Sequence, residues 1–228
     1  MKIQDLHSFD VTYREAPALQ EALREKLILR DISPLATNIV AGADVSYARN
    51  SDLFFAAVVL LSFPEMQIVE ESYATRKTSF PYIPGLLSFR EGPALLEAFA
   101  RLRRVPDVVI FDGQGIAHPR GIGLAAHLGL FLNIPTIGCA KSRLWGQHTD
   151  VGDMAGDSVP LTNNGETIGA VVRTRTKVKP VFVSPGNCIS LERAVAVVLS
   201  CCRGCRLPEP VRKAHLAVNR VRQAQHDH

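Results

Sequence analysis

The chain has 228 residues, 46% hydrophobic and 21% charged, which is enough apolar material for a core that needs no staples. The net charge of +4 favours polyanionic partners without identifying one. No apolar run reaches the roughly 20 residues that span a bilayer, and residues 1–5 open no secretory segment. These features argue against a membrane protein, and we expect a cytoplasmic one.

In chain order, the periodicity of apolar residues predicts a helix, three strands, a helix, a strand, a helix, three more strands and a last helix. The predicted helices span 16–29, 93–104, 124–132 and 191–202, and the predicted strands span 38–47, 53–63, 66–73, 107–111, 135–140, 167–174 and 181–183. Residues 62–65 look like a hairpin turn. Hairpin strands followed by strand–helix–strand alternation predict an α/β fold with a mixed sheet. No repeat or linker divides residues 1–228, so we expect a single domain.

Five cysteines are present, an odd number that argues against a disulfide framework. They are Cys139, Cys188, Cys201, Cys202 and Cys205. The last two form a lone CxxC, whereas a structural zinc site would need a second pair. Reduced thiols are therefore the favoured interpretation.

Two predicted strands deliver an aspartate after an apolar run, namely Asp44 and Asp112. Ligand sites of open α/β sheets lie at the carboxyl ends of strands, and carboxylates there suit a hard cation such as Mg²⁺. A turn or capping role is the alternative for each aspartate taken singly. The flanking glycines do not fit a dinucleotide fingerprint, because His118 occupies the position of the third glycine. A haloacid-dehalogenase-type phosphatase is excluded as well, since Gln114 stands where it needs a second aspartate.

Glu91 is the third candidate ligand, and its local sequence leaves two interpretations open. Ser88 and Glu91 match a capping box, in which the glutamate reaches back to the first amide of a helix. Pro93 fits better at the first helical position, which would leave Glu91 outside the helix and free to bind a ligand.

Four segments together resemble the endonuclease V family. They are residues 41–47 (AGADVSY), 81–91 (PYIPGLLSFRE), 109–119 (VIFDGQGIAHP) and 135–144 (PTIGCAKSRL), with weaker agreement at 184–187 and 206–210. The resemblance implies a ribonuclease-H-like fold with a central mixed sheet flanked by helices. It also implies a Mg²⁺-dependent DNA repair nuclease, with Mn²⁺ as a substitute ion; we expect a monomer. Such enzymes recognise deoxyinosine and cut the second phosphodiester bond on its 3′ side, and some members also act on inosine in RNA.

The resemblance also assigns roles to individual residues. It implies that the metal ligands are Asp44, Glu91 and Asp112, that Lys141 offsets charge on the phosphate, and that His118 and His215 lie near the metal. A solvated surface lysine is the alternative for Lys141. Residues 81–84 would form a wedge, Pro81, Tyr82, Ile83 and Pro84, which enters the duplex, although a rigid turn is the ordinary interpretation of such a loop. Gly85, Leu87 and Gly113 would line the pocket for the base.

Two departures from the family pattern stand out. Gln114 replaces the usual histidine between the glycines, and Arg120-Gly121 replaces an arginine pair. We expect activity to survive both, with altered affinity or substrate preference. Two rival functions remain: a ribonuclease-H-like nuclease of different substrate choice, and a non-catalytic nucleic-acid-binding protein. The wedge sequence argues against the first. The three acidic residues together with Lys141 argue against the second, because binding alone would favour losing negative charge near phosphates.

Overall fold

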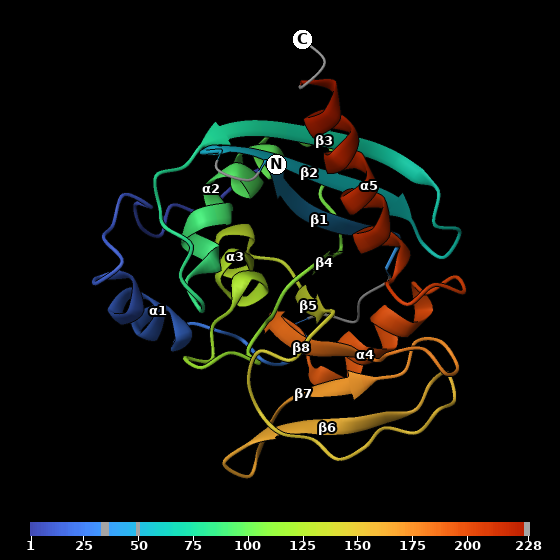
Figure 1. Ribbon diagram of the computed structural model, residues 1–228. Coiled ribbons are helices and arrows are strands. Elements are labelled where there is room, and N and C mark those ends of the chain that lie inside the picture. The colour runs from blue at the N-terminus through green and yellow to red at the C-terminus, as the bar shows by residue number, and fades with distance from the viewer. Residues whose placement is uncertain (33–36, 49–50, 226–228) are drawn as a thin grey trace.

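Eight strands form one mixed sheet in the order β3-β2-β1-β4-β5-β8-β7-β6 (Figure 1). The computed structural model describes residues 1–32, 37–48 and 51–225. The strands are β1 (Ile39–Tyr47), β2 (Leu53–Ser62), β3 (Ile68–Lys77), β4 (Val108–Phe111), β5 (Thr136–Ala140), β6 (Ser158–Asn163), β7 (Glu166–Val172) and β8 (Val181–Asn187). The helices are α1 (Ala16–Arg24), α2 (Leu87–Ala100), α3 (Leu124–Leu132), α4 (Leu191–Ser200) and α5 (Glu209–Ala224). The predicted α/β fold with a mixed sheet is confirmed.

The three central strands are parallel, so their carboxyl ends meet at one edge of the sheet. Ala43 of β1 pairs with Phe111 of β4, and Phe111 pairs with Gly138 of β5. The outer strands run antiparallel to their neighbours, and β2 and β3 form the predicted hairpin. The residues that follow β4 and β5 therefore emerge side by side, next to the second half of β1.

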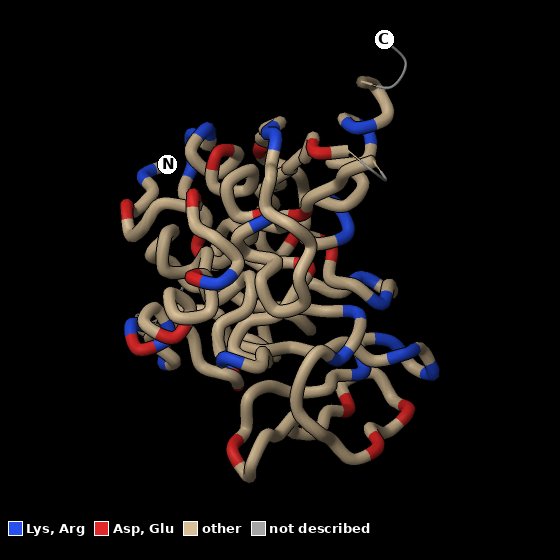
Figure 2. The backbone as a smooth tube through the Cα atoms, turned by 60° about the vertical axis from the view of Figure 1, so that its left-hand side comes forward, with Lys and Arg blue, Asp and Glu red and all other residues tan. Residues whose placement is uncertain are grey.

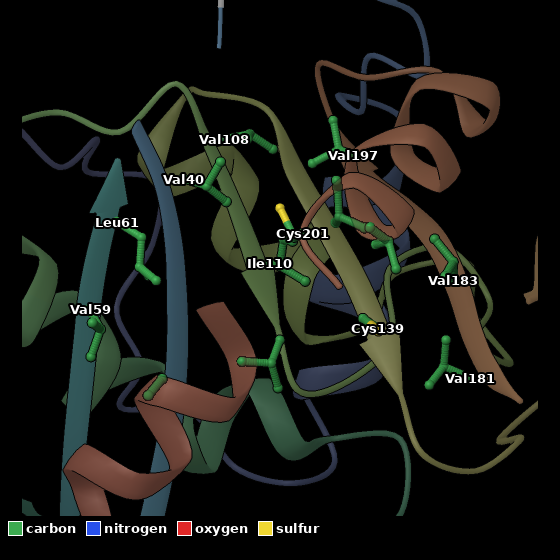
Figure 3. Packing of buried hydrophobic residues seen from close by; sticks show 14 of the residues in the cluster. Val40, Val59, Leu61, Val108, Ile110, Cys139, Val181, Val183, Val197 and Cys201 are labelled. Carbon is green, nitrogen blue, oxygen red and sulfur yellow. The ribbon is translucent and has the colours of Figure 1, made fainter. Parts of the chain in front are cut away.

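Helices cover both faces of the sheet, which explains the apolar runs in its strands. Helices α2 and α3 pack on one face, while α4 and α5 pack on the other (Figure 1). Alternate residues of β2 serve the two cores, with Phe54 on the α2 side and Phe55 on the α5 side. Figure 3 shows the second core, where Ile110 and Val183 of the sheet lie near Val197 of α4. A strand buried on both faces has no polar alternation. Within the described residues, no helix is long and apolar enough to cross a membrane.

The predicted start of the second helix is wrong, and so is the interpretation of Pro93 that depended on it. Helix α2 begins at Leu87, with Pro93 inside it, and its N-cap residue Leu86 makes no side-chain cap. Ser88 and Glu91 therefore do not form a capping box, and Glu91 lies inside the helix and not before it. The first turn buries Ser88 and Phe89 against the core. Burial of this turn outweighs the cost of an interior proline.

Other differences lie at the margins of the predicted pattern. Helix α1 ends at Arg24 and not at residue 29, because Ile28 instead bonds to Asn187, the last residue of β8, and to Cys188 after it. Strand β6 was not predicted; it lies at the sheet edge, the position in which Pro160 is tolerated. Helix α5 was not predicted either, since its buried face consists largely of alanine and valine.

Candidate active site

The sheet register places Asp44 and Asp112 next to each other. Ala43 pairs with Phe111 in the parallel β1–β4 ladder, so the two aspartates follow at the same level. Asp112 comes directly after the end of β4, as predicted, whereas Asp44 lies within β1, which continues to Tyr47. Both carboxylates are partly buried. The prediction that the aspartate follows a strand end is therefore right for Asp112. Asp44 lies inside β1 but reaches the same place, because the neighbouring strand β4 ends at that level.

Glu91 joins the two aspartates from α2. Burial, followed by the charges of Asp44 and Asp112, raises the pKa of Glu91 to about 8. Burial also raises the pKa of Asp44, and Asp112 adds to that shift. Among the residues that the structure describes, none donates a hydrogen bond to the Glu91 side chain. The three carboxylates are close enough to repel one another, which is costly unless a cation joins them.

Asp44 is held by a chain of polar side chains that leads to α5. His215 donates from Nδ1 to Asp44 Oδ2 over 2.8 Å. Asn219 donates from Nδ2 to His215 Nε2 over 3.2 Å, which fixes the imidazole proton on Nδ1. Ser46 Oγ in turn donates to Asn219 Oδ1 over 3.0 Å. His215 thus lies beside the carboxylates, where the resemblance places it, and Asn219 orients its ring.

Lys141 neutralises the second aspartate. Its Nζ lies 2.5 Å from Asp112 Oδ2, and its own side chain is 42% exposed, so it can also meet a ligand from solvent. Arg206 donates to the Lys141 carbonyl oxygen over 2.5 Å and supports the segment after β5. The lysine is therefore an exposed side chain that is ion-paired at the site.

The carboxylate cluster fits a divalent cation in its chemistry. In the described part of the chain, no three His, Cys, Asp or Glu side chains are arranged as a finished metal centre. His215 and Lys141 instead bind Asp44 and Asp112, and among the residues described the Glu91 carboxylate has no hydrogen-bond partner. An all-oxygen donor set of this kind suits Mg²⁺ or Mn²⁺ better than Zn²⁺.

A cavity of about 330 Å³ connects Asp112 to the predicted wedge and base pocket. Its lining includes Tyr82, Ile83, Pro84, Gly85 and Leu87 from one side, and Asp112, Gly113 and Lys141 from the other. Pro81 lies outside it and faces a second hollow beside α2. The volume is within the range of small-molecule sites. The structure thus brings together residues that are separated by about sixty positions in the sequence.

Three side chains converge on one carbonyl oxygen in this cavity, that of Gly85. Gln20 donates to it over 3.1 Å, Arg120 over 2.7 Å, and His118 Nε2 over 3.0 Å. Gly85 has a φ of +82°, a conformation that favours glycine. Burial, followed by the charge of Arg120, lowers the pKa of His118 to about 4. His118 therefore positions the loop and remains neutral.

Gln20 is a site residue that the sequence analysis missed. Its side chain is fully buried. Nε2 also donates to Ile122 O over 3.2 Å, and Oε1 accepts from Arg120 Nε over 2.6 Å. A signal was available, since Ala16, Gln20 and Leu23 share the buried face of α1. A glutamine on such a face needs buried polar partners.

Gln114 lines the same cavity and is only half satisfied. Its Nε2 donates to Ser142 O over 3.0 Å, but its buried Oε1 has no hydrogen-bond partner in the described part of the chain. The side chain therefore connects the loop after β4 to the loop after β5. Its backbone is tightly placed as well, because a Cβ on Gly138 would lie 2.5 Å from the Gln114 carbonyl carbon.

Comparison with known proteins agrees with this arrangement. The family model for endonuclease V matches residues 12–216. An endonuclease V from Dehalococcoides mccartyi is 52% identical over 221 residues, which cover 95% of this chain and 97% of the relative. The crystal structure of the Bacillus subtilis endonuclease V has a TM-score of 0.94 at 32% identity and covers 100% of both chains. Ciona intestinalis endonuclease V was solved in complex with a 24-mer DNA containing an inosine followed by a ribo-adenosine. It has a TM-score of 0.79 at 32% identity and covers 92% of this chain and 98% of its own.

Proposed function

Because the chain belongs to the endonuclease V family, we propose that it is a DNA repair endonuclease that recognises deoxyinosine, the product of adenine deamination. In this proposal it hydrolyses the second phosphodiester bond 3′ to the lesion with Mg²⁺, for which Mn²⁺ can substitute. The observation that carries the proposal is the shared cavity. One hollow is lined by the wedge loop on one side and by Asp112 and Lys141 on the other. A base held there lies next to the Asp112 carboxylate.

The wedge and the pocket support recognition of an extruded base. Tyr82 is 64% exposed at the tip of the loop, an unusual position for a large apolar ring. An apolar side chain of this kind can insert between base steps and kink the duplex. Hypoxanthine lacks the exocyclic amine of guanine, so a close-fitting wall formed in part by Gly85 and Gly113 can exclude guanine by sterics.

In this proposal, different residues of the site bind the ion, stabilise charge on the phosphate and position the base-pocket loop. Asp44, Glu91 and Asp112 would hold the ion, which when bound supplies Lewis-acid polarisation of the phosphate and a more acidic water. Lys141 offers an ammonium to the charge that develops on the phosphate oxygens. His215 holds the Asp44 carboxylate in place through Nδ1, and Asn219 fixes the orientation of the ring. His118 and Gln20 hold the base-pocket loop through Gly85.

An end-labelled duplex with a single deoxyinosine tests the proposal. The wild-type protein should nick the second phosphodiester bond 3′ to the lesion only when Mg²⁺ or Mn²⁺ is present, and it should spare matched adenine and guanine duplexes. Asp112→Asn is nearly isosteric and should abolish the nick. Cleavage of all three duplexes would favour a nuclease of different substrate choice. Binding without any cleavage would favour a non-catalytic protein.

Two further parts of the proposal need their own measurements. An inosine-containing RNA strand in the same assay determines whether RNA is a substrate as well. We place the reaction in the cytoplasm and expect a monomer, which sedimentation equilibrium at working concentrations tests.

A further inference from the structure

We propose that the loop between β7 and β8, residues 173–180, is a second phosphate-binding surface that holds the backbone of the substrate duplex outside the lesion. We call this segment the basic hairpin. The inference rests on the proposed function, since it assumes a duplex substrate in the active site. It adds a binding surface that neither the wedge nor the carboxylates provide.

The basic hairpin presents uncommitted positive charge. Arg175, Lys177 and Lys179 are all exposed. Within the described chain, none of their side chains takes part in a hydrogen bond or ion pair. Figure 2 shows basic segments gathered on one flank at mid-height, with acidic segments of the lower half lying below them. Free cations on one surface are the electrostatic signature of phosphate binding.

The backbone beneath these cations is braced, so the loop can bind without a large ordering cost. Arg173 donates to Val178 O over 2.6 Å and to Gly152 O over 2.8 Å. Thr174 Oγ1 donates to Arg206 O over 2.6 Å. Asp153, in the segment before β6, forms an ion pair with Arg173 at 3.5 Å. Asp153 is thus paired with Arg173 at the base of the hairpin and does not pair with the exposed Arg175, Lys177 or Lys179.

The basic hairpin is physically continuous with the active site. Arg206 Nη2 donates both to Lys141 O over 2.5 Å and to Pro180 O over 2.8 Å, so one nitrogen joins the catalytic-site segment to the end of the hairpin. The antiparallel pairing of Ala140 with Phe182 places the hairpin at the same sheet edge as Asp112. A duplex whose phosphate lies at Lys141 has its neighbouring phosphates within reach of the hairpin.

The test compares two triple substitutions that remove the same charge. The first is Arg175→Gln with Lys177→Gln and Lys179→Gln. The control is Lys2→Gln with Arg103→Gln and Arg104→Gln, three exposed residues at the opposite sheet edge, beside the end of α2 and before β4. Both are made in an Asp112→Asn background, and binding to the deoxyinosine duplex is measured from 50 to 200 mM salt. Thermal melting verifies that both variants are folded.

Three lost phosphate contacts should reduce the slope of log affinity against log salt by about 2.7, since each contributes roughly 0.9. When the salt is raised from 50 to 200 mM, the parent should therefore lose about 40-fold more affinity for the duplex than the hairpin variant loses. The control should keep the parent slope. Shortening the duplex on one side of the lesion should remove the difference between hairpin variant and parent, and shortening the other side should not.

Several results would overturn the inference. These are an unchanged slope in the hairpin variant, an equal change in the control, equal sensitivity to shortening on both sides, or a loss confined to single-stranded RNA. Failure of the proposed function is a separate result, because it would appear as absence of a deoxyinosine nick in the unsubstituted protein.

Discussion

Replacing Gln20 with leucine should destabilise the protein and loosen the base pocket together. The substitution keeps the side-chain size but removes the carboxamide that binds Gly85 O, Ile122 O and Arg120 Nε. The Gly85 carbonyl keeps Arg120 and His118 as donors. Ile122 O and Arg120 Nε lose the partner that Gln20 supplies. At about 1–3 kcal/mol for each buried group left unpaired, the cost is about 2–6 kcal/mol.

Gln114→Leu is the matched control, because it removes a second buried glutamine from the same cavity. Gln114 makes one side-chain hydrogen bond and already carries an unpartnered Oε1. Its loss leaves Ser142 O, on an exposed residue, to be hydrated. Relief of the orphan acceptor offsets that loss, so the free energy of unfolding should change by no more than about 1 kcal/mol.

Urea denaturation followed by circular dichroism measures both variants under the same conditions. Affinity for a deoxyinosine duplex relative to an undamaged one provides the second measurement. Gln20→Leu should lower both the urea midpoint and the discrimination between duplexes. Equal midpoints for the two leucine variants would refute the reasoning. So would a destabilised Gln20→Leu protein with unchanged discrimination, because Gln20 would then support the fold without positioning the pocket.

Three further predictions follow from the site. Glu91→Gln should raise the melting temperature of the metal-free protein. Burial, Asp44 and Asp112 raise the pKa of Glu91 to about 8, so folding must either protonate this carboxyl or bury its charge, whereas glutamine is neutral without that cost. The variant should also diminish the added stabilisation by Mg²⁺, and a lower metal-free melting temperature in scanning fluorimetry would contradict the ligand set. Burial lowers the pKa of His127 to about 3, so the unfolded chain takes up the proton first as the pH falls below about 6.5. The free energy of unfolding should therefore decrease by about 2 kcal/mol as the pH falls from 6.5 to 5. In urea titrations, a His127→Asn variant should show a shallower dependence of this free energy on pH. Parallel pH curves for the variant and the wild type would exclude His127 as the cause. Tyr82→Ala should change the unfolding free energy by less than about 0.5 kcal/mol, since the ring is 64% exposed. It should weaken binding to the deoxyinosine duplex more than binding of Mg²⁺, and equal losses in the two titrations would count against a wedge.

The sequence was most informative where local pattern and burial agree. The run Val108–Phe111 is apolar, short and followed by Asp112 and Gly113, and it forms β4 as predicted. Strand β2 is apolar on both faces because helices lie on both sides of it. The pattern failed where small residues carry the burial. Helix α5 buries Ala214 and Ala217, which give a weak periodic signal.

The site shows a different limit, because most of its contacts join residues far apart in the chain. The Gly85 carbonyl meets Gln20, His118 and Arg120, and no local spacing relates those positions. The start of α2 was mispredicted because Pro93 was weighed by local preference alone. Burial of Phe89 against the core decided the matter, and that contact exists only once the sheet has formed.

Packing of the core holds Asp44, Glu91 and Asp112 near one another, although their mutual repulsion lowers the stability of the fold. Gly42 lets α5 dock closely on β1, since a Cβ at this position would lie 1.9 Å from the Pro210 carbonyl oxygen. That close approach brings His215 within 2.8 Å of Asp44. Lys141 forms an ion pair with Asp112. No described side chain donates a hydrogen bond to Glu91, and burial and the neighbouring aspartates raise the pKa of that carboxyl to about 8. A fold that fixes three carboxylates together at such a cost is typical of a site organised around a ligand. A divalent cation would remove the repulsion that the protein's own cations leave unbalanced.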